Sequence, residues 1–296
     1  MSEWIEKEER GSLWMMRIIL FLCRHTGQLL VRPLLYPIAA YFYLSSAETR
    51  ASSLRFYAKL KGFSSGKDHF RQLHCFAQTL LDRIFILSGN SKRYTVTAQG
   101  REMLLNEQKQ GNGMILLGSH LGSFEACRVL VRERAGLDVH MVAYFGGSQK
   151  IRTILDELNP ELTSRIIDPT EPDAIFKMRE VIENGGVLAI LADRVGFGEK
   201  RATASFLDEQ IELPAGPYLL AHILGCPVYS FFGLLSDKYH YNSYVEQVAE
   251  RIVLPRKERQ QAIDAYAQAY ASRLEHYCRK YPYNWFNFYD FWKLKP

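Results

Sequence analysis

The sequence predicts an α/β fold, in which a mostly parallel central sheet is flanked by helices. Short apolar runs of roughly four to eight residues recur through the middle of the chain, with the length and composition of buried parallel strands. Amphipathic stretches with helical spacing separate these runs. Chemically versatile polar residues directly follow two of the runs, at the edge where open α/β sheets carry their ligands.

Each element is assigned from its pattern and length. Strands are predicted at 114–117, 139–145, 187–191 and 228–235. Helices are predicted at 67–89, 123–135, 149–158, 172–184, 216–224 and 256–280. No internal repeat, low-complexity tract or Gly/Ser linker interrupts the sequence. We therefore expect 47–296 to form one domain, preceded by a helical segment at 1–46.

The N-terminal segment is apolar but too often interrupted to cross a membrane. Residues 13–47 are rich in Leu, Ile, Tyr and Phe, yet charged residues break the segment before it reaches the roughly 20 apolar residues of a span. Together with Pro33 and Pro37, these charges favour short amphipathic helices at a membrane interface. A buried helical hairpin of the core is the alternative. Acidic residues occupy the position of a signal peptide's basic region, so we expect a cytoplasmic location.

The amino-acid composition of the chain limits which binding partners and which kinds of chemistry are expected. The chain carries 37 basic and 32 acidic residues, and its net charge of +5 suits an anionic membrane surface better than nucleic acid. Its five cysteines lie far apart and form no CxxC pair, so neither a disulfide framework nor a zinc site is expected. The nucleotide-binding and metalloprotease motifs are missing from the sequence, and we expect no metal and no cofactor.

The strongest motif occupies residues 118–125, where a predicted strand ends and a helix begins. On one continuous helix, a spacing of five would place His120 and Glu125 about 140° apart, so His120 must precede the helix for them to meet. Gly122 and Ser123 supply a flexible turn and a helix cap. A neutral imidazole accepts a proton well near pH 7, and Glu125 would fix its tautomer. A structural histidine beside a capping acid is the alternative.

A second motif at 189–198 again delivers charged residues at the end of an apolar strand. Arg194 is expected to bind a phosphate or a developing oxyanion, and Asp193 to position it or to contact the acceptor. Lys200 and Arg201 follow closely and would extend an anion site. A surface ion pair at a turn is the alternative reading of Asp193 and Arg194.

The C-terminal residues 283–293 are unusually dense in aromatic side chains. Amphipathic rings favour a membrane interface or an apolar groove. A strap that docks on the core would have the same composition. These two interpretations are compatible with each other.

In this order along the chain, these motifs resemble the bacterial lipid A late acyltransferases, within the H-x4-D/E glycerolipid acyltransferases. The resemblance covers roughly 20–293 and includes the segments 120–125 and 192–194, Phe206 with 213–217, and the segment 282–293. It implies a glycerolipid-acyltransferase-like domain on the cytoplasmic face of the bacterial inner membrane. It also implies acyl carrier protein or coenzyme A as the acyl donor.

The resemblance assigns roles to the motif residues. His120 is the implied general base and Glu125 its partner, while Asp193 and Arg194 line the acceptor or carbonyl site. Two residues of the third segment are implied to shape the acyl pocket: Pro214 and Gly216.

One departure concerns the acceptor. The Tyr-Arg-Pro element that is common in the family reads Tyr144, Phe145 and Gly146 here. Without this arginine, the acceptor need not be a glucosamine phosphate. The sequence is similar to relatives associated with aryl polyene pathways, whose acceptor would be another lipid or glycolipid.

The sequence thus predicts an O-acyltransferase that moves a fatty acyl group from a carrier thioester to a lipid hydroxyl without a covalent intermediate. Two alternatives stay open: a catalytically inactive lipid-binding protein of the same fold, and a thioester or lipid hydrolase. Product analysis separates the three.

Overall fold

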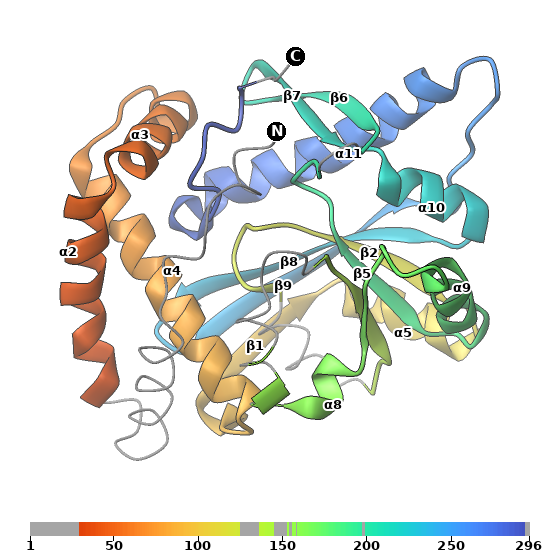
Figure 1. Ribbon diagram of the computed structural model, residues 1–296, viewed down its shortest axis with the longest axis horizontal. Helices are drawn as coiled ribbons and strands as arrows, with labels where there is room; N and C mark the ends of the chain where they lie inside the picture. The colour runs from red at the N-terminus through yellow and green to blue at the C-terminus, as the bar shows by residue number, and fades with distance from the viewer. Residues whose placement is uncertain are drawn as a thin grey trace.

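The computed structural model describes residues 30–124, 136–144, 153, 156–157, 159–196 and 199–293. It confirms the α/β fold class, with a mixed and mostly parallel seven-strand sheet in the order β1-β9-β8-β2-β5-β3-β4 (Figure 1). Its strands are β1 (Thr95–Gln99), β2 (Met114–Gly118), β3 (Val139–Val142), β4 (Ile166–Ile167), β5 (Val187–Leu191), β8 (Val228–Asp237) and β9 (His240–Ala249). Strands β8, β2, β5, β3 and β4 run parallel, whereas β9 is antiparallel to β8.

Helices cover both faces of the sheet. Their bounds are α4 (Gly66–Leu87), α5 (Arg101–Lys109), α8 (Pro160–Thr163), α9 (Ala174–Glu183), α10 (Gly216–Leu224) and α11 (Arg259–Lys280). A separate hairpin of β6 (Arg201–Phe206) and β7 (Glu209–Pro214) packs on α11. All four predicted strands are present, although β3 ends at Val142, earlier than predicted. The predicted helices at 123–135 and, in large part, 149–158 lie outside the described residues.

The central strand β2 has a core on each side. Its side chains alternate, so that Ile115 and Leu117 join the core that includes α10 and α11, while Met114 and Leu116 join the core that includes α4 and α5. Burial on both faces explains why the strand reads as an unbroken apolar run. The edge at which β2 and its parallel neighbours end is therefore fixed from both sides.

The described N-terminal part consists of η1 (Arg32–Leu34), α2 (Leu35–Ser45) and α3 (Ala47–Lys61). Helix α2 lies at the outer edge of the molecule alongside α4 (Figure 1). Large apolar side chains are exposed in this part, namely Leu34 of η1 and Tyr36, Tyr41, Phe42 and Leu44 of α2. Within the described ranges, none of the helices combines the length and apolar character needed to traverse a bilayer.

A buried ion pair joins this N-terminal part to the rest. Arg32 Nη2 donates to Asp82 Oδ1 at 2.5 Å, and both side chains are buried. The Asp82 carboxylate also accepts from the hydroxyls of Tyr94 and Tyr241, each at 2.9 Å. The Arg32 guanidinium lies 4.1 Å from the centre of the Tyr239 ring. Side chains from η1, from the residue before β1 and from β9 thus meet at one carboxylate of α4.

The aromatic tail is a docked strap, which we define as residues 282–293. Trp285 is 1% exposed and stacks on Phe56 of α3, with ring centres 4.9 Å apart. Its ring also lies 5.5 Å from that of Phe206 in the hairpin. Trp292 is buried as well, and its indole N–H donates to the Phe206 carbonyl. The strap therefore crosses between the helices and the hairpin as part of the core.

Candidate active site

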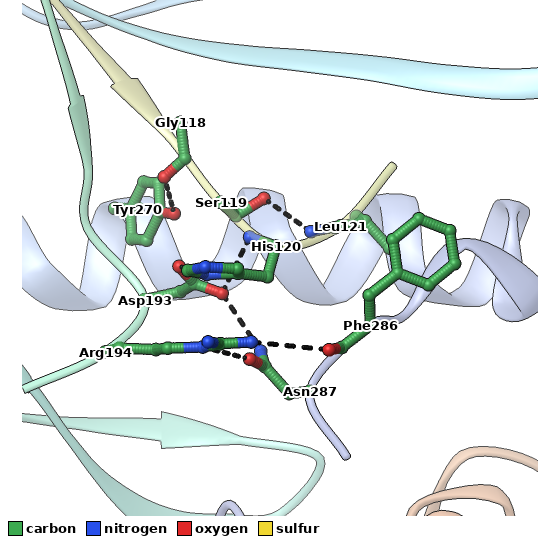
Figure 2. A network of polar contacts seen from close by, with 9 residues as sticks. All are labelled: Gly118, Ser119, His120, Leu121, Asp193, Arg194, Tyr270, Phe286 and Asn287. Atoms are coloured by element: carbon green, nitrogen blue, oxygen red, sulfur yellow. Dashed lines mark hydrogen bonds and ion pairs between the residues drawn. The ribbon is translucent and has the colours of Figure 1, made fainter. Parts of the chain in front are cut away.

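The register of two neighbouring strands brings the two sequence motifs together. Gly118 at the end of β2 lies opposite Leu191 at the end of β5, and the strands are parallel. His120 and Asp193 each follow two residues later, so they leave the same edge of the sheet side by side. The imidazole Nδ1 lies 2.9 Å from Asp193 Oδ1, and the backbone N–H of His120 donates to Asp193 Oδ2, also at 2.9 Å (Figure 2).

His120 lies in the loop that directly follows β2. Gly122 has φ +79°, and a Cβ at this position would lie 2.1 Å from the Gly233 carbonyl oxygen, so only glycine fits. Ser123 N donates to the same carbonyl at 2.7 Å. Ser119 Oγ accepts from Leu121 N at 3.2 Å, which makes the turn itself polar and rigid.

The strap runs antiparallel to this loop and locks it. Leu121 and Trp285 form a β-bridge. On either side of it, Phe286 N donates to the His120 carbonyl at 2.9 Å and Gly122 N donates to the Asn284 carbonyl at 2.8 Å. The backbone of His120 is thus fixed from behind by the C-terminal part of the chain.

Beyond the bridge, the strap places an amide between the two charged residues of the second motif. Asn287 Nδ2 donates to Asp193 Oδ2 at 2.9 Å, and Arg194 Nε donates to Asn287 Oδ1 at 2.7 Å (Figure 2). Arg194 Nη2 also donates to the Phe286 carbonyl at 3.3 Å. The Tyr289 ring lies over the guanidinium, 5.6 Å from its central carbon.

The site holds an ionised carboxylate and a neutral imidazole. Burial by itself would raise the pKa of Asp193, but His120, Arg194 and the Asn287 amide together lower it to about 2. Burial lowers the pKa of His120, and the charge of Arg194 lowers it further, against the opposing effect of Asp193. The imidazole is consequently uncharged near neutral pH, which is the state that can accept a proton.

A cavity of about 840 Å³ opens beside His120 and Arg194. Its wall is mostly apolar and comes from β3, β5, α9 and α10, with Val142, Ala143, Ile175, Met178, Ile190, Leu191, Pro217 and Leu220 among the lining residues. An imidazole and a guanidinium in the wall of a mostly apolar cavity suit a ligand with a polar reacting group and a hydrocarbon chain.

The family known as Bacterial lipid A biosynthesis acyltransferase matches residues 71–294, which is 224 of the 296 residues. This chain belongs to that family. Among the curated proteins compared with it, none matches significantly. Membership implies an enzyme of acyl transfer in lipid biosynthesis, with an acyl donor and a lipid acceptor.

The structure brings together some of the residues that the sequence singled out for this acyltransferase. Gly216 lines the cavity, and Pro214 is buried two residues before it at the end of β7. Lys200 is exposed and Arg201 pairs with Glu212 at 2.7 Å. These two basic residues are not among the described residues that line the cavity.

Two findings about this family member go beyond the sequence analysis. Asp193, expected to position Arg194 or to contact the acceptor, instead bonds His120 Nδ1. Glu125 lies outside the described residues. Asn287 was missed, because the aromatic density of the strap concealed its one buried amide at this site. The available signal was a polar residue between two aromatic ones, Phe286 and Phe288.

Proposed function

We propose that this acyltransferase moves a fatty acyl group from an acyl carrier protein or coenzyme A thioester to a hydroxyl of a lipid or glycolipid. The observation that carries the proposal is the contact between His120 Nδ1 and the buried Asp193. An ionised carboxylate only accepts hydrogen bonds, so Nδ1 must carry the proton and Nε2 keeps its lone pair. The residue lies at a cavity wide enough for a chain.

The proposed reaction has no covalent intermediate on the protein. His120 Nε2 takes the proton of the acceptor hydroxyl as its oxygen attacks the thioester carbonyl carbon. Arg194 or backbone N–H groups stabilise the resulting oxyanion. When the tetrahedral intermediate collapses, the carbon–sulfur bond breaks and the thiolate takes the proton back from the imidazolium. The products are an ester and a free carrier thiol.

The remaining predicted residues take supporting roles in this proposal. Because Asp193 occupies Nδ1, we assign the orientation of the ring to it. Glu125 keeps its proposed place as the second carboxylate of the motif, where its charge would stabilise the imidazolium. Pro214 and Gly216 shape the acyl pocket, and two basic residues are proposed to contact the anionic part of a substrate outside it: Lys200 and Arg201.

We place this acyltransferase on the cytoplasmic face of the bacterial inner membrane, bound to an anionic lipid surface. The exposed apolar side chains of α2 support this location. Next to them, a groove between α4 and the β8–β9 turn is lined by Arg71, Lys238 and Lys280. Apolar side chains flanked by basic ones are typical of helices that lie in a membrane interface.

The test is turnover with a defined donor and mass spectrometry of the product. With acyl-carrier-protein or acyl-CoA thioesters and extracted lipids, the wild-type chain should add one acyl group to a lipid. His120→Ala should lower kcat by about 10² to 10⁴. His276→Ala, at an exposed position on α11, is the matched control and should retain the wild-type rate.

Other products would favour the alternatives. Free fatty acid as the sole product would identify a hydrolase, in which water replaces the acceptor. Bound lipid without any thioester turnover would identify an inactive lipid-binding protein. A His120→Ala variant with wild-type rates would remove the general-base mechanism.

A further inference from the structure

We propose that Asn287 is a positioning residue for acyl transfer, whose amide holds Asp193 and Arg194 in a fixed arrangement around His120. This inference rests on the proposed function. It is based on a chain of contacts that begins at the imidazole and continues through Asp193 and the amide to the guanidinium. Asn287 itself does not contact His120 in these bonds, so its effect is exerted through the carboxylate.

The chemistry of its neighbours requires an amide at this position. Asn287 is 1% exposed, and both ends of its amide are used. A carboxylate can only accept and a guanidinium can only donate, so the N–H end must face Asp193 and the oxygen must face Arg194. Aspartate would place a second negative charge beside the first, and alanine would remove both bonds.

The amide completes the set of donors around Asp193. The carboxylate accepts from His120 Nδ1 on Oδ1, and from His120 N and Asn287 Nδ2 on Oδ2. Three donors in a dry site fix both the plane of the carboxylate and its ionised state. Without Asn287, only His120 would still donate to the Asp193 carboxylate among these three contacts. The carboxylate and the imidazole that it orients would then no longer be held in a fixed orientation.

The amide also separates two opposite charges. Asp193 and Arg194 are consecutive residues, and the Asn287 amide bonds to both, since it donates to Asp193 Oδ2 and accepts from Arg194 Nε. A direct pair would draw the carboxylate away from the imidazole and the guanidinium away from the cavity. The neutral amide between them donates to the carboxylate and accepts from the guanidinium. Arg194 therefore stays in the cavity wall beside His120.

The strap contains its own matched control. Asn284 lies three residues earlier and is 3% exposed. Its amide also makes two bonds, accepting from Leu235 N at 2.8 Å and donating to the Leu235 carbonyl at 3.0 Å. Asn284→Ala therefore removes the same number of side-chain bonds from the same segment without touching Asp193, and it keeps the backbone carbonyl that accepts from Gly122 N.

The experiment combines kinetics with a direct titration of the full chain. Asn287→Ala should lower kcat by about 10²-fold with KM changed less than about twofold, because orientation rather than binding is lost. Asn287→Asp adds a negative charge near the imidazole, which raises the pKa of His120 and moves the acid limb of the rate profile to higher pH. NMR of the labelled histidine rings reports the same shift without substrate.

Asn284→Ala should lower Tm while leaving the His120 titration and the acid limb where they are in the wild type. A purely structural role for Asn287 predicts that Asn287→Ala lowers stability while kcat of the folded protein stays close to wild type, and that result would overturn the proposal. If Asn284→Ala shifted the His120 titration as much as Asn287→Asp does, that result would also overturn the proposal. If Asn287→Ala fails to fold, the isosteric Asn287→Asp decides by NMR.

Failure of the proposed function gives a different result. A wild-type chain without acyl transfer would refute the function, whatever the titrations show. A wild-type chain that transfers acyl groups, combined with an unshifted His120 in Asn287→Asp, would refute only the role of Asn287.

Discussion

At the scale of single residues, the tautomer of His120 is the property that the site controls most tightly. Asp193 is fully buried and its pKa is lowered to about 2, so it stays ionised throughout the pH range in which the imidazole titrates. The ring must therefore keep its proton on Nδ1 whenever it is neutral. The buried, ionised carboxylate thus determines which nitrogen of the imidazole carries the proton.

Asp193→Asn should abolish that control. An asparagine amide that donates to Nδ1 would stabilise the tautomer with its proton on Nε2, which cannot act as a base. We expect kcat to fall by about 10² to 10⁴ in single-turnover assays. Asp290→Asn, in the strap and paired with the exposed Arg55, is the control and should differ little from wild type. A rate within twofold of wild type for Asp193→Asn would contradict this assignment.

Residues of the candidate site could be predicted from the sequence only where they directly follow a strand. His120, Asp193 and Arg194 were found because apolar runs end just before them. The contact between His120 and Asp193 depends on β2 and β5 being neighbours, which the pattern of apolar residues does not specify. Asn287 is 94 residues beyond Asp193, and no local pattern connects the two.

At the scale of elements, the attachment of the N-terminal helices depends on Arg32 and Asp82. Burial raises the pKa of Asp82 to about 6, against the lowering effects of Arg32, Tyr94 and Tyr241. A raised folded-state pKa stabilises the protonated fold at low pH, and this contribution is lost as pH rises through about 6. Above that pH the ionised carboxylate depends on its arginine.

Arg32→Met should therefore be destabilising in a pH-dependent way. At pH 8 the variant retains a buried carboxylate without its cation, and we expect a loss of about 3 kcal/mol in the free energy of unfolding. At pH 5 the carboxyl is protonated in both proteins, so the loss should be smaller. Urea denaturation at the two pH values measures the difference.

An exposed pair provides the comparison for Arg32→Met. Arg179→Met breaks the solvent-exposed contact with Glu183 in α9 and should cost less than about 1 kcal/mol at either pH. A penalty for Arg32→Met that is the same at pH 5 and pH 8 would show that Asp82 does not titrate in this range.

Strands that are buried on both faces were easier to predict from the sequence than strands that are partly exposed. Strand β5 has the predicted bounds, because its apolar run is packed from both sides. Strand β9 was missed, since exposed and buried residues mix along it next to the edge of the sheet. The β6–β7 hairpin was missed for a related reason: it lies outside the main sheet and buries mainly one face on α11.

At the scale of the whole molecule, exposed apolar side chains on α2 give the protein a distinct outer edge. We expect the full chain to bind vesicles that contain anionic lipid, as judged by co-sedimentation. Tyr41→Glu combined with Leu44→Glu, at positions 65% and 76% exposed, should weaken binding by about 100-fold because two apolar side chains no longer insert.

The opposite end of the molecule offers a matched pair of exposed apolar positions. Ile223 and Val253 are 66% and 55% exposed and lie near α10 and the β9–α11 connection, away from α2 (Figure 1). Ile223→Glu combined with Val253→Glu should leave vesicle binding within about twofold of wild type. Equal losses for both double variants would mean that α2 is not the membrane-binding surface.

The strap is synthesised after the two motifs that it contacts, and this order has a chemical consequence. Residues 284–287 hold the backbone of His120 and complete the donors around Asp193, although Asn287 is translated 94 residues after Asp193. A nascent chain can pair β2 with β5 long before it has those residues. Until they emerge from the ribosome, His120 and Asp193 lack these contacts, so we expect copies that stop before residue 284 to be inactive in acyl transfer.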